Sequence, residues 1–230
     1  MNFLLTDKEI FTLFLTSFPA IILFSSYFIY FKKKGIGQLT FSKVFLAGIL
    51  IALPAGEMNS FIKSTFKNGN PINDALLDGF FAGGLVEELL KFSVLYFLVL
   101  KTNSFKNQFE AIFYGIAVSV SFAIIENFTY VYSHKELLKY LTSQEIALAR
   151  SYSALLMHTL NGIIMGFYFS FFAVDKDKKF LGFCILLPIL FHGSYNFLIT
   201  LYKPYGICVI ILMIVFIFKL YKNFKNIINY

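Results

Sequence analysis

The chain has 230 residues, of which 58% are hydrophobic and only 14% charged, and its mean hydropathy is +0.71. Soluble domains carry about 25% charged residues, so this composition excludes an ordinary water-soluble fold and indicates an integral membrane protein. The net charge of +7 comes from lysines that lie between apolar runs and form no single basic face. This pattern argues against nucleic acid as a partner and for a lipid bilayer.

Seven apolar runs are candidates for membrane spans, because a spanning helix needs about 20 mostly apolar residues. The runs are far longer than the ~10-residue alternating strands of a membrane barrel, so only helices can be meant. We therefore predict an all-α transmembrane bundle that forms a single domain over residues 1–230. The expected spans, in chain order, are residues 10–31, 41–62, 75–100, 109–132, 151–174, 180–201 and 205–218.

Lysine and arginine are distributed unequally between the two ends of these spans, which predicts an orientation. With the N-terminus outside, the inner segments carry twelve of these residues and the outer segments seven, so the positive-inside rule favours N-out, C-in. The inner set is Lys32, Lys33, Lys34, Lys43, Lys101, Lys106, Lys176, Lys178, Lys179, Lys219, Lys222 and Lys225. The outer set is Lys8, Lys63, Lys67, Lys135, Lys139, Arg150 and Lys203.

Two features near the outer ends have open interpretations. Residues 134–149 mix leucines with polar residues, which fits a helix lying in the interface over the site or a plain exposed loop. Glu57 sits near the outer end of the second run with Asn59 beside it, and we expect it to be a boundary residue that faces water.

The third run contains two adjacent carboxylates and an ammonium. Lys91 follows Glu87 at i,i+4 and Glu88 at i,i+3, so it neighbours both on one helical face. It can neutralise one carboxylate and leave the other free to titrate, an arrangement that tunes pKa. A packing salt bridge between helices is the alternative.

Three further runs bury polar groups, and an ionisable residue in a spanning helix costs ~3 kcal/mol or more at its centre. Counted from the outer ends, these groups lie at a similar depth, ~10 to 20 Å. We therefore expect the rings of His158 and His192 to lie roughly 4 to 7 Å apart around one water or metal ion. The groups are Glu126 and Asn127 in the fourth run, Arg150 and His158 in the fifth, and His192 and Asn196 in the sixth.

Four motifs in these runs resemble the PrsW family of bacterial intramembrane proteases and together cover about half the chain. They are EELLK at 87–91 (the family's EExxK), FAIIENFTY at 122–130, RSYSALLMHTLNGIIMG at 150–166 and HGSYNF at 192–197. The resemblance implies a multi-pass protein of the bacterial plasma membrane. It also implies a stress-response protease that makes the site-1 cut in membrane-bound anti-sigma factors on the outer side. The family is distantly similar to CAAX prenyl endopeptidases and bacteriocin-immunity proteins.

We interpret the buried groups as a site for peptide hydrolysis by an activated water. Glu87 or Glu88 is the expected general base, and Lys91 sets the charge of the pair. His158 and His192 hold the water, or bind a metal together with Glu126. Asn127, Asn196 and Arg150 are candidates for binding the substrate or the oxyanion.

A cofactor is left open by the sequence. Two histidines and a carboxylate suit catalytic zinc, but the HExxH motif is absent, which leans slightly against a metal.

Two other classes of protein also remain open at this point. An ion- or proton-coupled transporter would bury the same residue types, although it would usually show inverted repeats and none is apparent. A non-enzymatic immunity or partner protein would bury its glutamates for stability alone.

Overall fold

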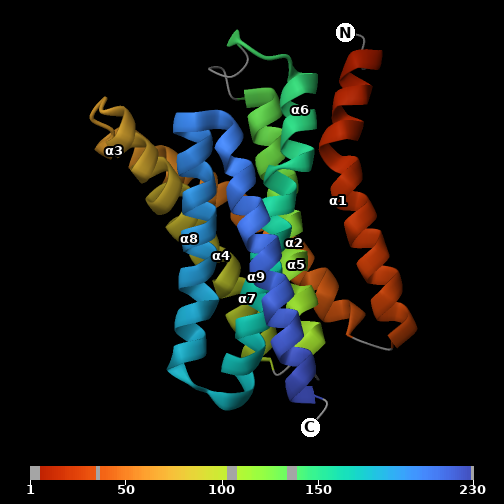
Figure 1. Ribbon diagram of the computed structural model, residues 1–230. Coiled ribbons are helices and arrows are strands. Elements are labelled where there is room, and N and C mark those ends of the chain that lie inside the picture. Colours follow the sequence, from red (N-terminus) through yellow and green to blue (C-terminus); the bar gives the residue numbers. More distant parts are fainter. Residues whose placement is uncertain (1–5, 35–36, 103–107, 134–138, 229–230) are drawn as a thin grey trace.

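The structure is a computed structural model, and it describes residues 6–34, 37–102, 108–133 and 139–228. The regular elements in these ranges are all helical, and Figure 1 shows them packed side by side, with the two chain ends at opposite ends of the bundle. This confirms the predicted all-α class. The elements are α1 Asp7–Lys34, α2 Gln38–Phe66, α3 Pro71–Leu76, η1 Leu77–Glu87, α4 Glu88–Leu95, η2 Tyr96–Leu100, α5 Gln108–Ser133, α6 Ser143–Tyr152, α7 Ala154–Asp175, α8 Lys178–Tyr202, η4 Lys203–Tyr205 and α9 Gly206–Ile228.

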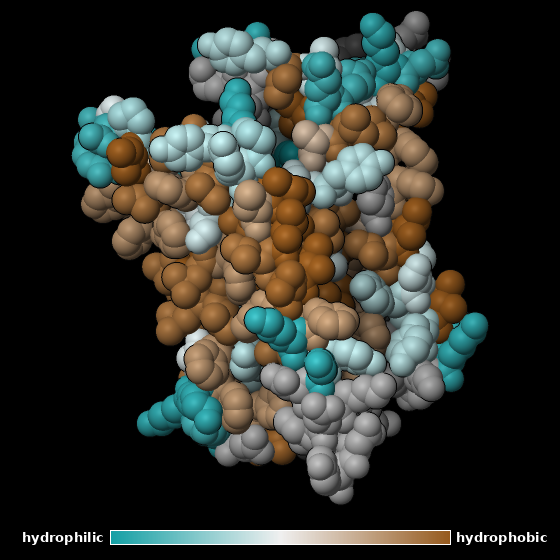
Figure 2. All heavy atoms as spheres, in the orientation of Figure 1, coloured by the Kyte–Doolittle hydropathy of each residue, from teal (hydrophilic) through white to brown (hydrophobic). Residues whose placement is uncertain are grey.

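Four helical stretches of the described chain are long and apolar enough to cross a membrane, and a bent helix makes a possible fifth. The bent helix consists of Asp7–Phe18 and Ala20–Tyr30, which meet at 41°. Figure 2 shows the result, a broad apolar belt between two hydrophilic ends. The seven-span count and the N-out orientation stay predictions. The four stretches are Gln38–Phe66, Gln108–Ser133, Ser143–Val174 and Lys178–Lys222, the last of which contains α8 and most of α9.

The expected third span is one continuous but irregular helix. Asn70 caps its start by accepting hydrogen bonds from the backbone amides of Ile72 and Asn73, and Pro71 occupies the first turn. After the short α3, the chain widens into the 11-residue π-helix η1, returns to α-helix in α4 and widens again in η2. Wide turns of this kind are rare and occur frequently at functional sites. Here the first one ends at Glu87.

Small residues set how closely the central helices approach. A Cβ at Gly162 of α7 would lie 2.5 Å from the carbonyl oxygen of Gly115 in α5, and one at Gly166 would lie 2.6 Å from that of Ala111. A Cβ at Gly79 of η1 would likewise lie 2.6 Å from the carbonyl oxygen of Gly193 in α8. In a membrane, such contacts between backbones are a main source of helix association. They bring α5, α7, α8 and η1 together around the polar residues.

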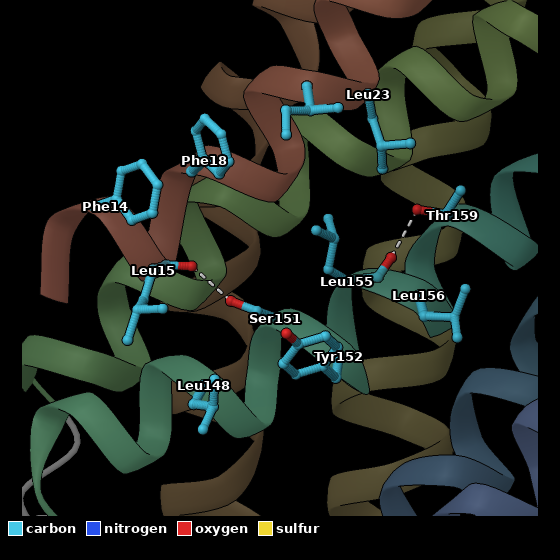
Figure 3. A pocket seen from close by; sticks show the side chains of 11 residues that line it. Phe14, Leu15, Phe18, Leu23, Leu148, Ser151, Tyr152, Leu155, Leu156 and Thr159 are labelled. Carbon is cyan, nitrogen blue, oxygen red and sulfur yellow. Dashed lines mark hydrogen bonds between the residues drawn. The ribbon is translucent and has the colours of Figure 1, made fainter. Parts of the chain in front are cut away.

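Helix α1 lies at the edge of the bundle and leaves an apolar cavity of about 620 Å³ against α6 and α7. Figure 3 shows Phe14 and Phe18 on one wall and Leu155 on the other. The hydroxyls of Ser151 and Thr159 donate to backbone carbonyls there, and the described residues that line the cavity include no carboxylate, imidazole or ammonium.

Candidate active site

The junction of η1 and α4 supplies two carboxylates and an ammonium, all of them buried. The Lys91 Nζ donates to Glu88 Oε1 at 2.8 Å and lies 3.7 Å from Glu87 Oε2. Their side chains are exposed by 4% or less, so each charge must be stabilised by neighbouring groups and not by water. Lys91 is thus paired closely with Glu88 and only loosely with Glu87, which separates the two acids that the sequence could not tell apart.

His192 of α8 faces both acids with different ring nitrogens. Its Nδ1 lies 2.7 Å from Glu88 Oε1, and since a carboxylate accepts, Nδ1 donates, which in the neutral imidazole leaves Nε2 as the acceptor. Nε2 lies 3.9 Å from Glu87 Oε2, and both of these atoms are buried without a hydrogen-bond partner among the described residues. Two polar atoms of this kind, face to face, leave room for one shared atom between them.

His158 of α7 completes the cluster from the opposite side. Its Nε2 lies 2.7 Å from Glu126 Oε2, and its Nδ1 lies 3.0 Å from Lys91 Nζ, so Nε2–H donates and Nδ1 accepts. The centroids of the His158 and His192 rings are 4.9 Å apart, with the rings nearly perpendicular. This separation lies within the expected range of 4 to 7 Å.

A second charged layer lies beyond His158. Arg150, at the end of α6, directs its Nε to Asn127 Oδ1 at 2.7 Å and its Nη2 to Glu126 Oε2 at 2.9 Å. The guanidinium also stacks on the ring of Tyr130, 3.8 Å from its centroid. Glu126 is therefore held from two sides, by Arg150 and by His158. The oxygen of Asn127 is already engaged by Arg150.

Three of the buried groups could together hold a metal ion, namely Glu87, His158 and His192. Each offers a ligand atom, and these atoms lie within 4.8 Å of one another. The set differs from the expected one, in which Glu126 was the carboxylate, because Glu126 sits behind His158. In that place Glu126 orients the imidazole, as carboxylates behind ligating histidines commonly do.

The donor atoms of this set fit a divalent ion such as zinc. Two histidines and one glutamate are a known set for catalytic zinc, and the bare His192 Nε2 and Glu87 Oε2 are directly available. Tetrahedral ligands ~2.0–2.1 Å from zinc lie about 3.3 Å apart, so these two atoms need to close by roughly half an ångström. His158 Nδ1 joins only if the Lys91 ammonium leaves it.

Two polar residues complete the surroundings. Asn196 lies one helical turn after His192 in α8. Its amide nitrogen and His192 Nε2 both border the space that a side chain at Gly83 would occupy. Asn59 of α2 donates from Nδ2 to Glu87 Oε1 at 3.0 Å. Sequence reasoning missed Asn59, and the only signal was its place beside Glu57, which is exposed in the structure.

The segment expected to cover the site is partly described. Residues 134–138 lie outside the described residues, and helix α6 begins at Ser143 after a capping box between Thr142 and Glu145. The helix packs against α1, α5 and α7 and ends next to Arg150, which points inward to Glu126. This part of the segment is therefore a packed helix that delivers a residue to the polar cluster.

Comparisons with known proteins agree on one family. Residues 38–221 match the family described as PrsW family intramembrane metalloprotease, a range that includes every site residue named above. A "Protease PrsW" of Oceanobacillus iheyensis is 30% identical over 92% of this chain and 95% of its own length. Those of Geobacillus kaustophilus and Bacillus subtilis strain 168 are both 31% identical, over 71% and 68% of this chain and 68% and 67% of their own lengths. No solved structure shows significant similarity.

Proposed function

This chain belongs to the PrsW family of intramembrane metalloproteases and is a multi-pass membrane protease, and from that premise we propose how and on what it acts. It hydrolyses a peptide bond in a single-span membrane protein, close to the outer face of the plasma membrane. The nucleophile is a water molecule that Glu87 activates and that His192 holds. Of the classes left open by the sequence, the transporter and the immunity protein have no support from the family match.

One observation carries the mechanism, the facing pair of partnerless atoms Glu87 Oε2 and His192 Nε2, 3.9 Å apart. That distance is too long for a hydrogen bond but suits a water oxygen within ~2.8 Å of each atom. Buried polar atoms are rarely left unsatisfied in proteins, so such a pair marks a place for a bound molecule. Glu88 Oε2 is also buried without a partner among the described residues, but the Glu88 carboxylate is already paired through Oε1 with both Lys91 and His192, so Glu87 is the better base.

The proton path follows from these positions. Glu87 Oε2 removes a proton from the water as its oxygen attacks the carbonyl carbon of the substrate. Glu87 then returns this proton to the leaving amide nitrogen, and the C–N bond breaks. His192 Nε2 accepts the water's other hydrogen and so orients it. The free amide of Asn196, beside Gly83, is the donor for the developing oxyanion.

A zinc ion, if bound, would be held by Glu87, His158 and His192, and it would lower the pKa of bound water and polarise the carbonyl. Glu88 and Glu126 would keep their present task of orienting the two imidazoles. The family description favours a metal, against the slight preference that we drew from the missing HExxH motif. Metal analysis of the purified protein tests this point. About one zinc per chain, lost in His192→Ala, supports the metal form, and full cleavage after chelation contradicts it.

For the substrate, we propose a single-span anti-sigma factor cut on its extracytoplasmic side. Two considerations support this: the motif resemblance, and a buried site formed among apolar helices long enough to cross a membrane, which favours substrates that share the bilayer. Unwound peptide backbone is tolerated at membrane depth only where protein or water satisfies it, and the polar cluster provides such a place.

The test is cleavage of a reporter that carries the juxtamembrane and transmembrane segments of an anti-sigma factor between two epitope tags. Co-expression with the wild-type protease should produce two tagged fragments. Glu87→Gln should lower cleavage at least ~100-fold while the protein still accumulates, because the base is lost but the side-chain shape is kept. Glu57→Gln, at an exposed site on α2, is the matched control. Cleavage by Glu87→Gln at the wild-type rate would refute the mechanism.

A further inference from the structure

We propose that Asn59 of α2 is a positioning residue of the active site, which holds the Glu87 carboxylate so that one oxygen faces His192. The inference rests on the role of Glu87 proposed above. It concerns a helix that contributed no residue to the site expected from the sequence. Asn59 is 28 positions away from Glu87 in the chain, so only the packing of α2 against η1 brings them together.

The contact orients Glu87 in one way. Asn59 Nδ2 donates to Glu87 Oε1 at 3.0 Å, and an ionised carboxylate only accepts, so the amide nitrogen must face it. Within the described part of the chain, this is the one hydrogen bond that Glu87 accepts. With Oε1 tied to α2, Oε2 is left pointing at the gap before His192 Nε2.

The Lys91 ammonium explains why Glu87 needs such a tie. It lies 3.7 Å from Glu87 Oε2, just beyond hydrogen-bond distance, in a region where charge attraction is weakly screened. Without Asn59, the Glu87 carboxylate is free to swing into a direct ion pair with Lys91. That pair would neutralise the base and empty the water position.

The oxygen of the same Asn59 amide is available for a second hydrogen bond. Asn59 Oδ1 is buried and has no donor among the described residues. It belongs to the same amide group whose nitrogen holds the Glu87 carboxylate. A backbone N–H of the substrate is the donor that Oδ1 would take, so Asn59 would also register the peptide against Glu87.

Substitutions of Asn59 separate positioning from packing. Asn59→Ala removes the donor, and Asn59→Asp keeps the volume but sets a carboxylate beside Glu87 Oε1. If Asn59 acts by donation, both variants lose about 10- to 100-fold in kcat on the tagged reporter, as is usual for partners that orient a catalytic group. KM should stay within about twofold. Asn59→Asp also adds a negative charge, so the packing control is Asn59→Leu, which keeps the volume without donor or charge and should cleave like the wild type if Asn59 only fills space.

Glu57→Gln, two residues away and exposed, is the matched control and should leave kcat unchanged. A kcat of Asn59→Leu or Asn59→Asp within twofold of wild type, or an effect on KM alone, would overturn the inference. A wild-type protein that does not cut the reporter contradicts the proposed function instead. In that event a structure of Asn59→Ala still decides, because Glu87 Oε2 should have moved onto Lys91 Nζ. If Glu87 Oε2 instead stays beside His192 Nε2 in that variant, the inference is overturned without any activity measurement.

Discussion

At the scale of single residues, the buried acidic and basic side chains of this protein form a row of successive contacts. Arg150 holds Glu126, Glu126 orients His158, His158 accepts from Lys91, and Lys91 pairs with Glu88. Burying a charge without a partner is costly, so each link stabilises the next. Glu87 is only loosely paired with Lys91 and turns its Oε2 toward His192 Nε2, which is why we propose it as the base.

The close pair of Lys91 and Glu88 leads to a prediction about stability and activity together. Glu88→Ala should reduce both cleavage and accumulation in the membrane, because it breaks the direct buried ion pair of Lys91, at a cost of about 3–5 kcal/mol. The double variant Glu88→Ala/Lys91→Met removes both charges. It should accumulate like the wild type yet remain inactive, since His192 has lost the acceptor that orients it.

Quantitative immunoblots of membrane fractions, together with reporter cleavage, measure both effects. Equal accumulation of the single and double variants would show that the Lys91 charge is satisfied in another way.

A further residue-scale prediction concerns Arg150. The guanidinium contacts Glu126 and Asn127 at once and stacks on Tyr130, a geometry that an ammonium cannot reproduce. Arg150→Lys should therefore lower kcat about 10-fold and Arg150→Ala about 100-fold, through loss of His158 orientation. The matched control is Lys179→Ala, since Lys179 is exposed and forms only a loose surface pair with Asp177. Reporter kinetics with wild-type rates for Arg150→Lys would contradict this assignment.

At the scale of elements, close backbone packing determines which polar residues meet. Glycines in η1 and α7 allow these helices to touch α8 and α5, and the π-helical turns of η1 end where Glu87 enters the cluster. The register between helices follows from these contacts. Changing one contact should shift side chains that are far from it.

Gly162 provides the test of this packing. A Cβ there would lie 2.5 Å from the carbonyl oxygen of Gly115, whereas a Cβ at Gly182 in α8 would meet nothing within 4 Å. Gly162→Ala should destabilise the fold by about 1–3 kcal/mol, because overpacking forces the helices apart. Gly182→Ala should be neutral or slightly stabilising, since alanine favours helix. Thermal unfolding of the two variants in detergent makes the comparison, and equal melting temperatures would contradict the packing argument.

At the scale of the whole molecule, an apolar belt separates two hydrophilic ends, and the chain termini lie at opposite ends. Opposite termini agree with an odd number of crossings. The lysine bias predicts the orientation, with the end that carries Lys33 and Lys178 on the inner side of the membrane.

Single-cysteine labelling tests this orientation. In a background of Cys184→Ser and Cys208→Ser, Lys33→Cys and Lys178→Cys should resist a membrane-impermeant maleimide in intact cells. Lys67→Cys, at the other end, should react. All three positions are exposed, so access to the reagent depends on the side of the membrane and not on burial. Labelling of Lys33→Cys and Lys178→Cys from outside would reverse the orientation.

The sequence by itself determined the features that depend on local spacing and on the bilayer. Long apolar runs can only be helices in lipid, and the i,i+3 and i,i+4 spacings place Lys91 beside Glu87 and Glu88 in any helix. Shared depth was enough to bring His158 near His192. The four motifs were enough to indicate the family that the comparisons show.

Only the tertiary structure decided which atoms face one another, because the rotation and register between helices depend on packing contacts that no spacing reveals. It paired Glu88 with His192, turned Glu87 Oε2 toward His192 Nε2, and placed Glu126 behind His158. It also brought Asn59 from α2 to the carboxylate while Glu57, two residues earlier, stayed at the surface. Asn59 and Glu57 are near neighbours in the sequence. The rotation of about 200° between them puts them on opposite faces of α2, so that one faces the site and the other faces the surroundings.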